Sequence, residues 1–168
     1  LPAHAERVFV GKRCGDHTVT QTEITSLIAR YARQGKRVVR LKGGDPGLFG
    51  RLAEETDELD RLALPYRVRA GVSALTVATT GTGMLLTRRG VSLGFTALTP
   101  RAEGGAVAGV SFDVRKRLPL VLFMSVKVAD ETARQLLDEG WETSTPAAIV
   151  FNAGSDGETV FRTDLGGL

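Results

Sequence analysis

Residues 40–50 read RLKGGDPGLFG and overlap the end of a short apolar run, RVVRL at residues 37–41. Gly43 and Gly44 permit positive φ angles and a close approach of a ligand to the backbone, and Pro46 stiffens the turn behind them. Two interpretations fit these residues. One is a tight loop before a helix; the other is a cofactor loop at the carboxyl end of a strand, where open α/β sheets bind ligands.

The segments on either side of this loop alternate between strand and helix patterns. Thr20 and Glu23 form a capping box, apolar residues then follow at helical spacing, and Gly35 is placed to end that helix. A second helix is predicted at about residues 49–62. Strands are predicted at residues 8–10, 37–41 and 66–68. This order indicates a parallel sheet with covering helices.

The second half of the chain repeats the α/β rhythm after a loop-rich segment at residues 81–90 and a Gly/Ala-rich connection at residues 101–109. Helices are predicted towards residue 80 and from an Asp130 cap to Gly140, and strands at residues 94–98, 120–124, 147–151 and 159–162. We therefore predict an α/β fold with two domains, residues 1–90 and 91–168. Neither end closes a recognisable element, so we expect both domains to be incomplete.

The composition is that of a globular protein with a core. Of the 168 residues, 42% are hydrophobic and 24% charged, and the formal charge is +3. Arginine supplies 17 of the 22 basic residues, and its planar fork suits carboxylates and phosphates. A polyanionic ligand is therefore expected. Nucleic acid is not expected, because no dense basic run with interleaved aromatics is present.

Several residue counts exclude other classes of site. Cys14 is the only cysteine, which excludes an internal disulfide and a cysteine-cluster metal site, and His4 and His17 lack the paired spacing of a metal-binding helix. We therefore expect no metal. No apolar run reaches membrane-spanning length and no signal-peptide pattern opens the chain, so we expect a cytoplasmic protein without membrane contact.

The motifs, taken in order along the chain, resemble one family. They are VFVGKR at residues 8–13, GKRVVRLKGGDPGLFGR at 35–51, LPYRVRAGVSA at 64–74, LLTRRGVS at 85–92, LVLFMSVK at 120–127 and TPAAIVFNAG at 145–154. Together they are similar to the uroporphyrinogen-III C-methyltransferases of the tetrapyrrole methylase superfamily. The resemblance covers nearly the whole chain, which makes it far more specific than a lone glycine motif.

The resemblance implies a fold, a reaction and an assembly. The fold is two α/β domains with S-adenosyl-L-methionine held in the cleft between them, and the enzymes are usually homodimers. The reaction methylates two pyrrole carbons of the tetrapyrrole uroporphyrinogen III to give precorrin-2 for sirohaem and cobalamin synthesis. The family's glycine-rich first loop and a strand with an acidic base would lie before Leu1, so the resemblance also implies an incomplete first domain.

The family's motifs assign roles to individual positions. The cofactor-binding residues implied are Gly43, Gly44, Asp45, Leu48, Ser73, Ala74, Met124 and Ala153. Lys12 takes the place of the proton donor, and Arg51, Arg88 and Arg89 are expected to bind substrate carboxylates. The chemistry fits these roles, since backbone groups at the glycines can bind the polar end of the cofactor and Asp45 can attract its positive charge.

The chain also differs from the family pattern. It has Gly47 where phenylalanine is usual, Arg88 where a histidine is usual, and Thr99-Pro100 after the next strand. Two alternative functions therefore stay open. One is another methylase of the superfamily that acts on a later corrin intermediate or a different substrate. The other is a non-catalytic relative that binds cofactor or tetrapyrrole without turnover.

Overall fold

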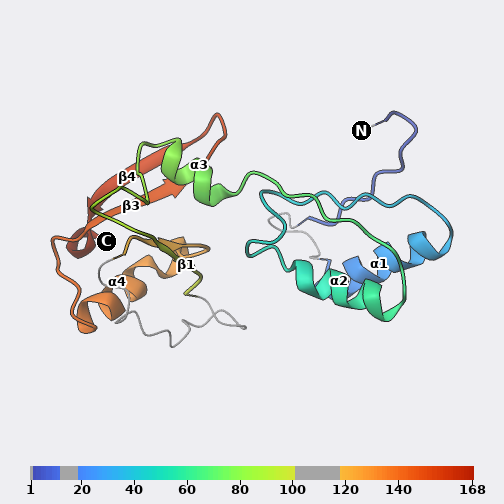
Figure 1. The fold of residues 1–168 in the computed structure, drawn as a ribbon, viewed down its shortest axis with the longest axis horizontal. Coiled ribbons are helices and arrows are strands. Elements are labelled where there is room, and N and C mark those ends of the chain that lie inside the picture. Colours follow the sequence, from blue (N-terminus) through green and yellow to red (C-terminus); the bar gives the residue numbers. More distant parts are fainter. Residues whose placement is uncertain (1, 12–18, 101–117) are drawn as a thin grey trace. The chain divides into compact units, whose positions relative to one another are not determined.

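The structure is a computed structural model that describes residues 2–11, 19–100 and 118–168 (Figure 1). Its contacts divide the chain into two compact units, Leu1–Gly71 and Val72–Leu168. Residues 72–90 pack with the second unit, where the Arg162 guanidinium donates to the carbonyl of Thr82 at 2.7 Å. The boundary between the two compact units therefore falls earlier in the chain than residue 90. The domain limits 1–90 and 91–168 stay a prediction.

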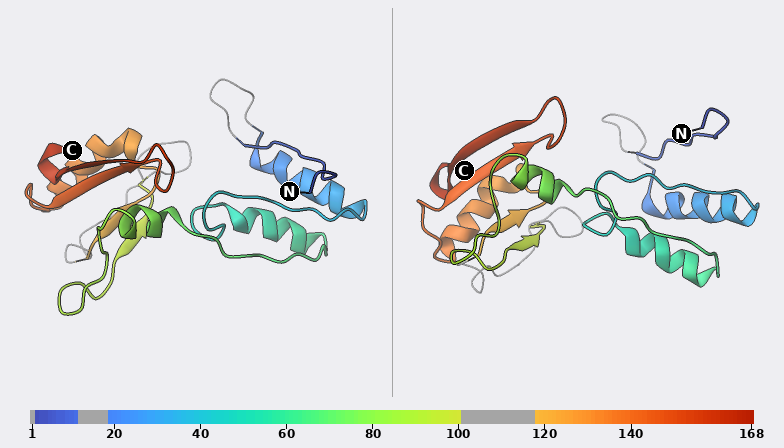
Figure 2. Two further views of the ribbon diagram at one scale, coloured as in Figure 1. Left: turned by 90° about the horizontal axis from the view of Figure 1, so that it is seen from above. Right: turned by 45° about the horizontal axis from the view of Figure 1, so that its top comes forward.

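Two helices, α1 (Gln21–Arg33) and α2 (Leu52–Arg61), form the framework of the first unit. They lie side by side in Figures 1 and 2 and contact each other. The predicted capping box is confirmed: the Thr20 hydroxyl accepts the N–H of Glu23 at 3.2 Å, and the Glu23 carboxylate accepts the N–H of Thr20 at 2.7 Å. Helix α1 ends before Gly35, whose φ of +73° suits glycine at this position.

The strands predicted at residues 8–10, 37–41 and 66–68 are wrong for the described part of the first unit, in which no strand is formed. Their apolar side chains stay largely in solvent, and Val39 and Leu41 are 59% and 63% exposed. An apolar run reports a preference for burial, whereas a strand also needs a neighbour to pair its backbone N–H and C=O groups. Among the described residues of this unit, these segments form no such backbone pairing.

The second unit contains all the elements predicted within its described residues, with ends shifted by a few positions. Strand β1 (Thr96–Leu98) pairs in parallel with β2 (Leu120–Leu122), Thr96 lying opposite Leu120. The remaining elements are α3 (Ala74–Thr80), the 3-10 helix η2 (Val126–Val128), α4 (Ala129–Asp138), the antiparallel pair β3 (Pro146–Phe151) and β4 (Thr159–Asp164), and the 3-10 helix η3 (Leu165–Gly167). A parallel strand pair and covering helices establish the α/β class.

The core of the second unit joins α4 to the parallel strands. Ala133, Leu136 and Leu165 are buried there, and the partly buried side chains packed against them are Leu98, Leu120, Leu122, Leu137, Trp141 and Leu168. The predicted cap of α4 is corrected, since Val128 holds the N-cap position and Asp130 lies in the first turn. A carboxylate in that turn still complements the positive end of the helix dipole, which explains the misplaced cap.

Gly71 gives a direct test of the packing in the first unit. A Cβ atom at this position would lie 2.3 Å from the carbonyl oxygen of Gly44, and backbone cannot yield as a flexible side chain can. We expect Gly71→Ala to lower the free energy of unfolding by about 1–3 kcal/mol, measured by urea denaturation. Gly94→Ala is the control, because a Cβ there meets nothing within 4 Å. Equal stability of the two variants would contradict this packing.

Candidate functional site

The Asp45 carboxylate joins two loops of the first unit. Its Oδ1 accepts the N–H of Gly47 at 2.8 Å, which closes the turn of the GGDPG segment on itself. Its Oδ2 accepts the N–H of Gly71 at 3.0 Å, twenty-six residues further along the chain. Asp45 therefore fixes the loop at residues 43–50 to the segment that leads into Ser73.

The glycines around Asp45 have different physical reasons to be glycine. Gly44 has a φ of +75°, a conformation that side chains with a Cβ rarely adopt. Gly71 packs directly on the carbonyl of Gly44. Gly43 differs from both, because a Cβ built there would meet nothing within 4 Å. The loop thus has a tightly packed side formed by Gly44 and Gly71, and an open backbone position at Gly43.

A buried carboxylate lies behind the loop. Glu55 is only 4% exposed and accepts hydrogen bonds from three side chains: the Lys42 ammonium at 2.7 Å, the Gln21 amide at 2.9 Å and the Arg40 guanidinium at 3.3 Å. Burial by itself raises the pKa of the Glu55 carboxyl. The hydrogen bonds from Lys42 and Gln21 and the charges of Lys42 and Arg40 outweigh that effect, so the pKa lies below its ordinary value.

Leu48 and Arg51, also predicted from the sequence, lie at the far side of the loop. Leu48 donates its N–H to the carbonyl of Asp45 at 3.3 Å, and its side chain is 47% exposed. Arg51 is the N-cap of α2 with a φ of +53°, and its guanidinium makes two contacts of 2.6 Å with the Glu54 carboxylate. The pairing holds Arg51 at the end of the loop next to Glu54.

Four of the predicted cofactor residues belong to the second unit. Ser73 is buried and caps α3, since its hydroxyl accepts the N–H of Leu75 at 3.1 Å, and Ala74 is the first residue of that helix. Ala153 lies in the β3–β4 turn. This turn reaches α3, because a Cβ at the adjacent Gly154 would lie 2.7 Å from a methyl group of Val77. The structure thus brings the α3 helix and the turn of Ala153 together.

Met124 follows strand β2 with a φ of +55° and a side chain that is 57% exposed. Because β1 and β2 are parallel, their carboxyl ends lie at the same edge, and the N–H of Phe123 donates to the carbonyl of Leu98 at 2.8 Å. Met124 therefore stands at the edge where open α/β sheets bind ligands. The departure at Thr99-Pro100 lies at the same edge.

Arg88 and Arg89 lie in an exposed turn of the second unit. The backbone of Arg88 pairs with that of Ser92 in both directions, at 3.0 and 2.8 Å, and Gly90 takes a φ of +77° within the turn. Lys12, predicted as the proton donor, lies outside the described residues. The structure therefore collects Gly43, Gly44, Asp45, Leu48 and Arg51 in the first unit, and Ser73, Ala74, Ala153, Met124, Arg88 and Arg89 in the second.

Sequence reasoning missed the network around Glu55, although one signal could have found it. Glu55 falls on the same face of α2 as Leu52, Leu59 and Leu62. A carboxylate within an apolar stripe requires a buried partner, because an unpaired buried charge is strongly destabilising. The identity of its partners could not be derived in this way, since Gln21 is 34 residues distant.

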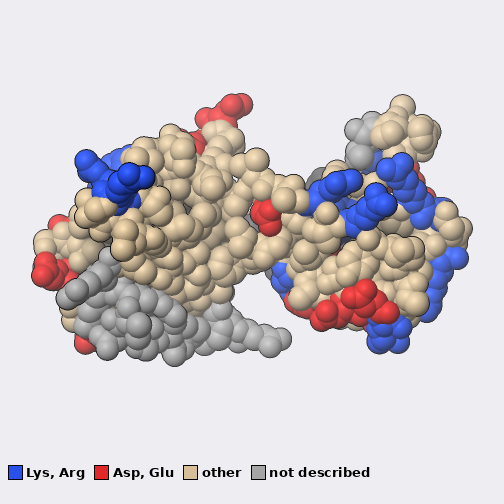
Figure 3. All heavy atoms as spheres, viewed as in Figure 1, with Lys and Arg blue, Asp and Glu red and all other residues tan. Residues whose placement is uncertain are grey.

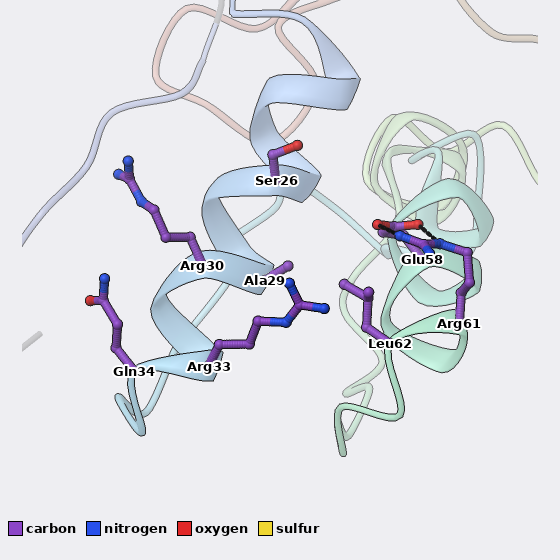
Figure 4. A pocket seen from close by; sticks show the side chains of 8 residues that line it. All are labelled: Ser26, Ala29, Arg30, Arg33, Gln34, Glu58, Arg61 and Leu62. Atoms are coloured by element: carbon purple, nitrogen blue, oxygen red, sulfur yellow. Dashed lines mark hydrogen bonds and ion pairs between the residues drawn. The ribbon is translucent and has the colours of Figure 1, made fainter.

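A hollow lies at the C-terminal ends of α1 and α2 and contains none of the predicted residues. Its volume is about 530 Å³, and it is lined by Ser26, Ala29, Arg30, Arg33, Gln34, Glu58, Arg61 and Leu62 (Figure 4). Arg61 is paired there with Glu58 at 2.6 Å. Basic residues in the last turns of both helices complement the helix dipoles, and this accounts for them without a ligand.

The described residues were also compared with the requirements of charged surfaces, membrane spans and metal sites. Lys and Arg side chains gather on the face of the first unit drawn in Figure 3. Within residues 2–11, 19–100 and 118–168, no helix has the length and apolar character needed to cross a membrane. The same ranges hold no group of three or more His, Cys, Asp or Glu side chains arranged to bind a metal ion.

Comparison with known proteins assigns the chain to one family. The model of the Tetrapyrrole (Corrin/Porphyrin) Methylases matches residues 2–168. The chain therefore belongs to the tetrapyrrole methylase family, and the fold class predicted from the sequence is confirmed.

Among individual relatives, the chain is similar to siroheme synthases. The chain is 37% identical to siroheme synthase 2 of Yersinia enterocolitica and 38% identical to siroheme synthase 2 of Klebsiella pneumoniae. Both matches cover 98% of this chain. It spans about a third of the length of these relatives, 35% and 36% respectively. The alignments therefore leave about two thirds of each relative unmatched.

Solved structures support membership of the same family. The uroporphyrin-III C-methyl transferase of Thermus thermophilus, complexed with S-adenyl homocysteine, is 36% identical with a TM-score of 0.81; the match covers 97% of this chain and 69% of that one. A cobalt precorrin-4 methyltransferase is 25% identical with a TM-score of 0.73, and the match covers 90% of this chain and 63% of the methyltransferase chain. Methyltransferases of tetrapyrroles thus share this fold.

Asp45 can be tested through its two accepted hydrogen bonds. Asn in its place keeps the shape but offers only one accepting oxygen, so one of the N–H groups of Gly47 and Gly71 loses its partner. We expect Asp45→Asn to lower the free energy of unfolding by about 1 kcal/mol in urea denaturation. Asp57→Asn, the same chemical change at an exposed position of α2, is the control. If both substitutions have the same effect, Asp45 does not join the loops.

Glu55 predicts a specific dependence of stability on pH. Its pKa is lower in the folded state than in the unfolded state, so its stabilisation is present above the unfolded pKa of about 4.3 and is lost as pH falls through the folded pKa. We expect the stability difference between the unsubstituted protein and Glu55→Gln to be largest near neutral pH and to shrink in acid. Urea denaturation across a pH series measures this difference. A difference independent of pH would contradict the ionised, paired state of Glu55.

Proposed function

We propose that this chain carries an S-adenosyl-L-methionine site and methylates carbon atoms of uroporphyrinogen III to give precorrin-2. The observation that carries the proposal is the pair of glycine loops joined by Asp45, found in a chain of the tetrapyrrole methylase family. The 36% identity to the Thermus uroporphyrin-III C-methyl transferase supports this reaction above others of the family. The proposal includes a cytoplasmic homodimer with the domain limits 1–90 and 91–168.

The residues of the first loop fit the cofactor. A ligand can approach the backbone at Gly43, since a Cβ there would meet nothing within 4 Å. The fixed conformation of Gly44 and Asp45 means that little ordering is needed when a ligand binds. The solved Thermus structure is a complex with S-adenyl homocysteine, the form that this cofactor takes after methyl transfer. S-adenosylhomocysteine is therefore the suitable probe of the site.

Bound S-adenosyl-L-methionine supplies an electrophilic methyl group, and the protein has to orient the reactants and bind their charges. Backbone groups at Gly43 and Gly44 bind the polar end of the cofactor, and the Asp45 charge favours its positive centre. Leu48 and Met124 provide apolar and polarizable surface. The further cofactor contacts proposed are Ser73, Ala74 and Ala153.

The substrate side of the proposal rests on arginine and lysine. The arginines at positions 51, 88 and 89 bind carboxylates of the tetrapyrrole through their planar forks. Arg51 already holds the Glu54 carboxylate in this way, with two contacts of 2.6 Å. Lys12 is the proposed proton donor.

A second candidate is methylation of a later corrin intermediate. The likeness to a cobalt precorrin-4 methyltransferase favours it, as do the departures from the uroporphyrinogen pattern at Arg88 and at Thr99-Pro100. Incubation with a series of tetrapyrroles distinguishes the two candidates. The leading proposal predicts that uroporphyrinogen III is methylated faster than any corrin.

The proposal is tested with the full-length protein, uroporphyrinogen III and S-adenosylmethionine labelled in its methyl group. We expect label in the tetrapyrrole, with a uroporphyrinogen-III C-methyltransferase assayed in parallel. Absence of transfer by this protein, with transfer by the relative, would overturn the proposal. Cofactor binding without transfer to any tetrapyrrole would support the non-catalytic alternative.

Gly43 offers a sharper test of where the cofactor binds. We expect Gly43→Ala to leave the free energy of unfolding unchanged, because the added methyl group meets nothing in the free protein. The same methyl group would occupy the space of the ligand, so affinity for S-adenosylhomocysteine in calorimetric titration should fall about tenfold or more. Gly94→Ala, also in open space, should bind normally. Normal binding by Gly43→Ala would place the ligand elsewhere.

A further inference from the structure

Glu55 lies where it can control the cofactor loop, and the following inference rests on the proposed function of that loop. Lys42 directly precedes Gly43, and Glu55 lies in the first turn of α2, just after the loop ends. The 2.7 Å contact between their side chains therefore closes the chain across a span of 13 residues that contains the whole GGDPGLFG segment.

The other contacts of Glu55 fix this closure to the rest of the first unit. Gln21, the first residue of α1, donates at 2.9 Å, and Arg40 donates from the segment before the loop at 3.3 Å. Both ends of the loop are thus tied to α1 through one carboxylate. The Lys42 and Glu55 side chains are only 11% and 5% exposed, so solvent and salt weaken their attraction little.

Other ion pairs of α2 differ from this one. Arg51–Glu54 and Arg61–Glu58 each join residues three apart in the sequence, and their arginine side chains are at least 60% exposed. Such pairs contribute little to stability. A buried charge that served folding alone could be replaced by well-packed apolar residues without loss. What an apolar replacement cannot reproduce at Glu55 is the simultaneous fixing of three donors, Gln21 of α1 and both Arg40 and Lys42 of the segment before the loop.

We propose that Glu55 and Lys42 are positioning residues for the cofactor, forming an internal clasp that holds the GGDPG loop in its binding conformation before the ligand arrives. A loop closed in advance loses less conformational freedom when the ligand binds, and this raises affinity. Neither residue has to touch the cofactor for this effect. The clasp acts through the backbone of Gly43 and Gly44 and through the two bonds that Asp45 accepts.

Two measurements on the full-length protein test the clasp in the variants Glu55→Gln, Lys42→Met and Lys42→Arg. The first is amide hydrogen exchange of Gly47 and Gly71 without ligand, which reports whether the Asp45 bonds persist. The second is the affinity for S-adenosylhomocysteine. Glu58→Gln is the control, because it changes a partly exposed glutamate, with a side chain 33% exposed, that pairs with Arg61 further along α2.

We expect Glu55→Gln and Lys42→Met each to speed exchange of both glycine amides and to weaken binding about tenfold. A protein that carries both Glu55→Gln and Lys42→Met should be no worse than either single variant, since the two residues act as a unit. Lys42→Arg keeps the cation and should restore near-normal exchange and affinity, whereas Glu58→Gln should change neither.

Unchanged exchange and affinity in Glu55→Gln would overturn the clasp. So would equal behaviour of Lys42→Met and Lys42→Arg, and this comparison decides the matter if Glu55→Gln fails to fold. If the unsubstituted protein binds no S-adenosylhomocysteine, the proposed cofactor site fails. The exchange rates of Gly47 and Gly71 then still decide whether the clasp holds the loop.

Discussion

The Asp45 carboxylate is the contact on which the rest of the site depends. It binds the N–H of Gly47 within its own loop and the N–H of Gly71 in the next, and it thereby joins two segments that are separated by helix α2. The close packing of Gly71 on the carbonyl oxygen of Gly44 requires that Gly71 has no Cβ atom. Glu55 adds a second layer, since it holds Lys42 at the start of the same loop. The loop is thus held by the hydrogen bonds that Asp45 accepts and by the contact of Lys42 with Glu55.

The fold could be predicted where local chemistry decides it. Thr20 and Glu23 predict the start of α1 because a capping box needs no information from distant residues. The strands at residues 8–10, 37–41 and 66–68 show the opposite case. Their apolar residues were recognised, but pairing depends on a neighbouring strand, which a local pattern cannot reveal. Asp130 failed as a cap for a related reason: carboxylates favour both the cap and the first turn of a helix.

The site could be predicted only as far as the family's motifs extend. They placed the glycines and Asp45 in one loop, and the structure shows what the loop does with them: Gly44 adopts a positive φ, Gly43 faces open space, and Asp45 binds two amides. From the sequence Asp45 is expected to attract the positive charge of the cofactor, and its role in joining the loops comes from the structure. The bond from Gln21 to Glu55 was likewise beyond prediction, because it depends on how α1 and α2 pack.

In the proposed site, a sulfonium cofactor binds at the backbone of Gly43 and Gly44. Titration of the isotopically labelled full-length protein with S-adenosylhomocysteine, followed by the NMR signals of its backbone amides, tests this claim most directly. We expect the largest changes at Gly43 and Gly44, with smaller changes at Gly71. Saturable binding with changes confined to residues outside the two glycine loops would contradict it.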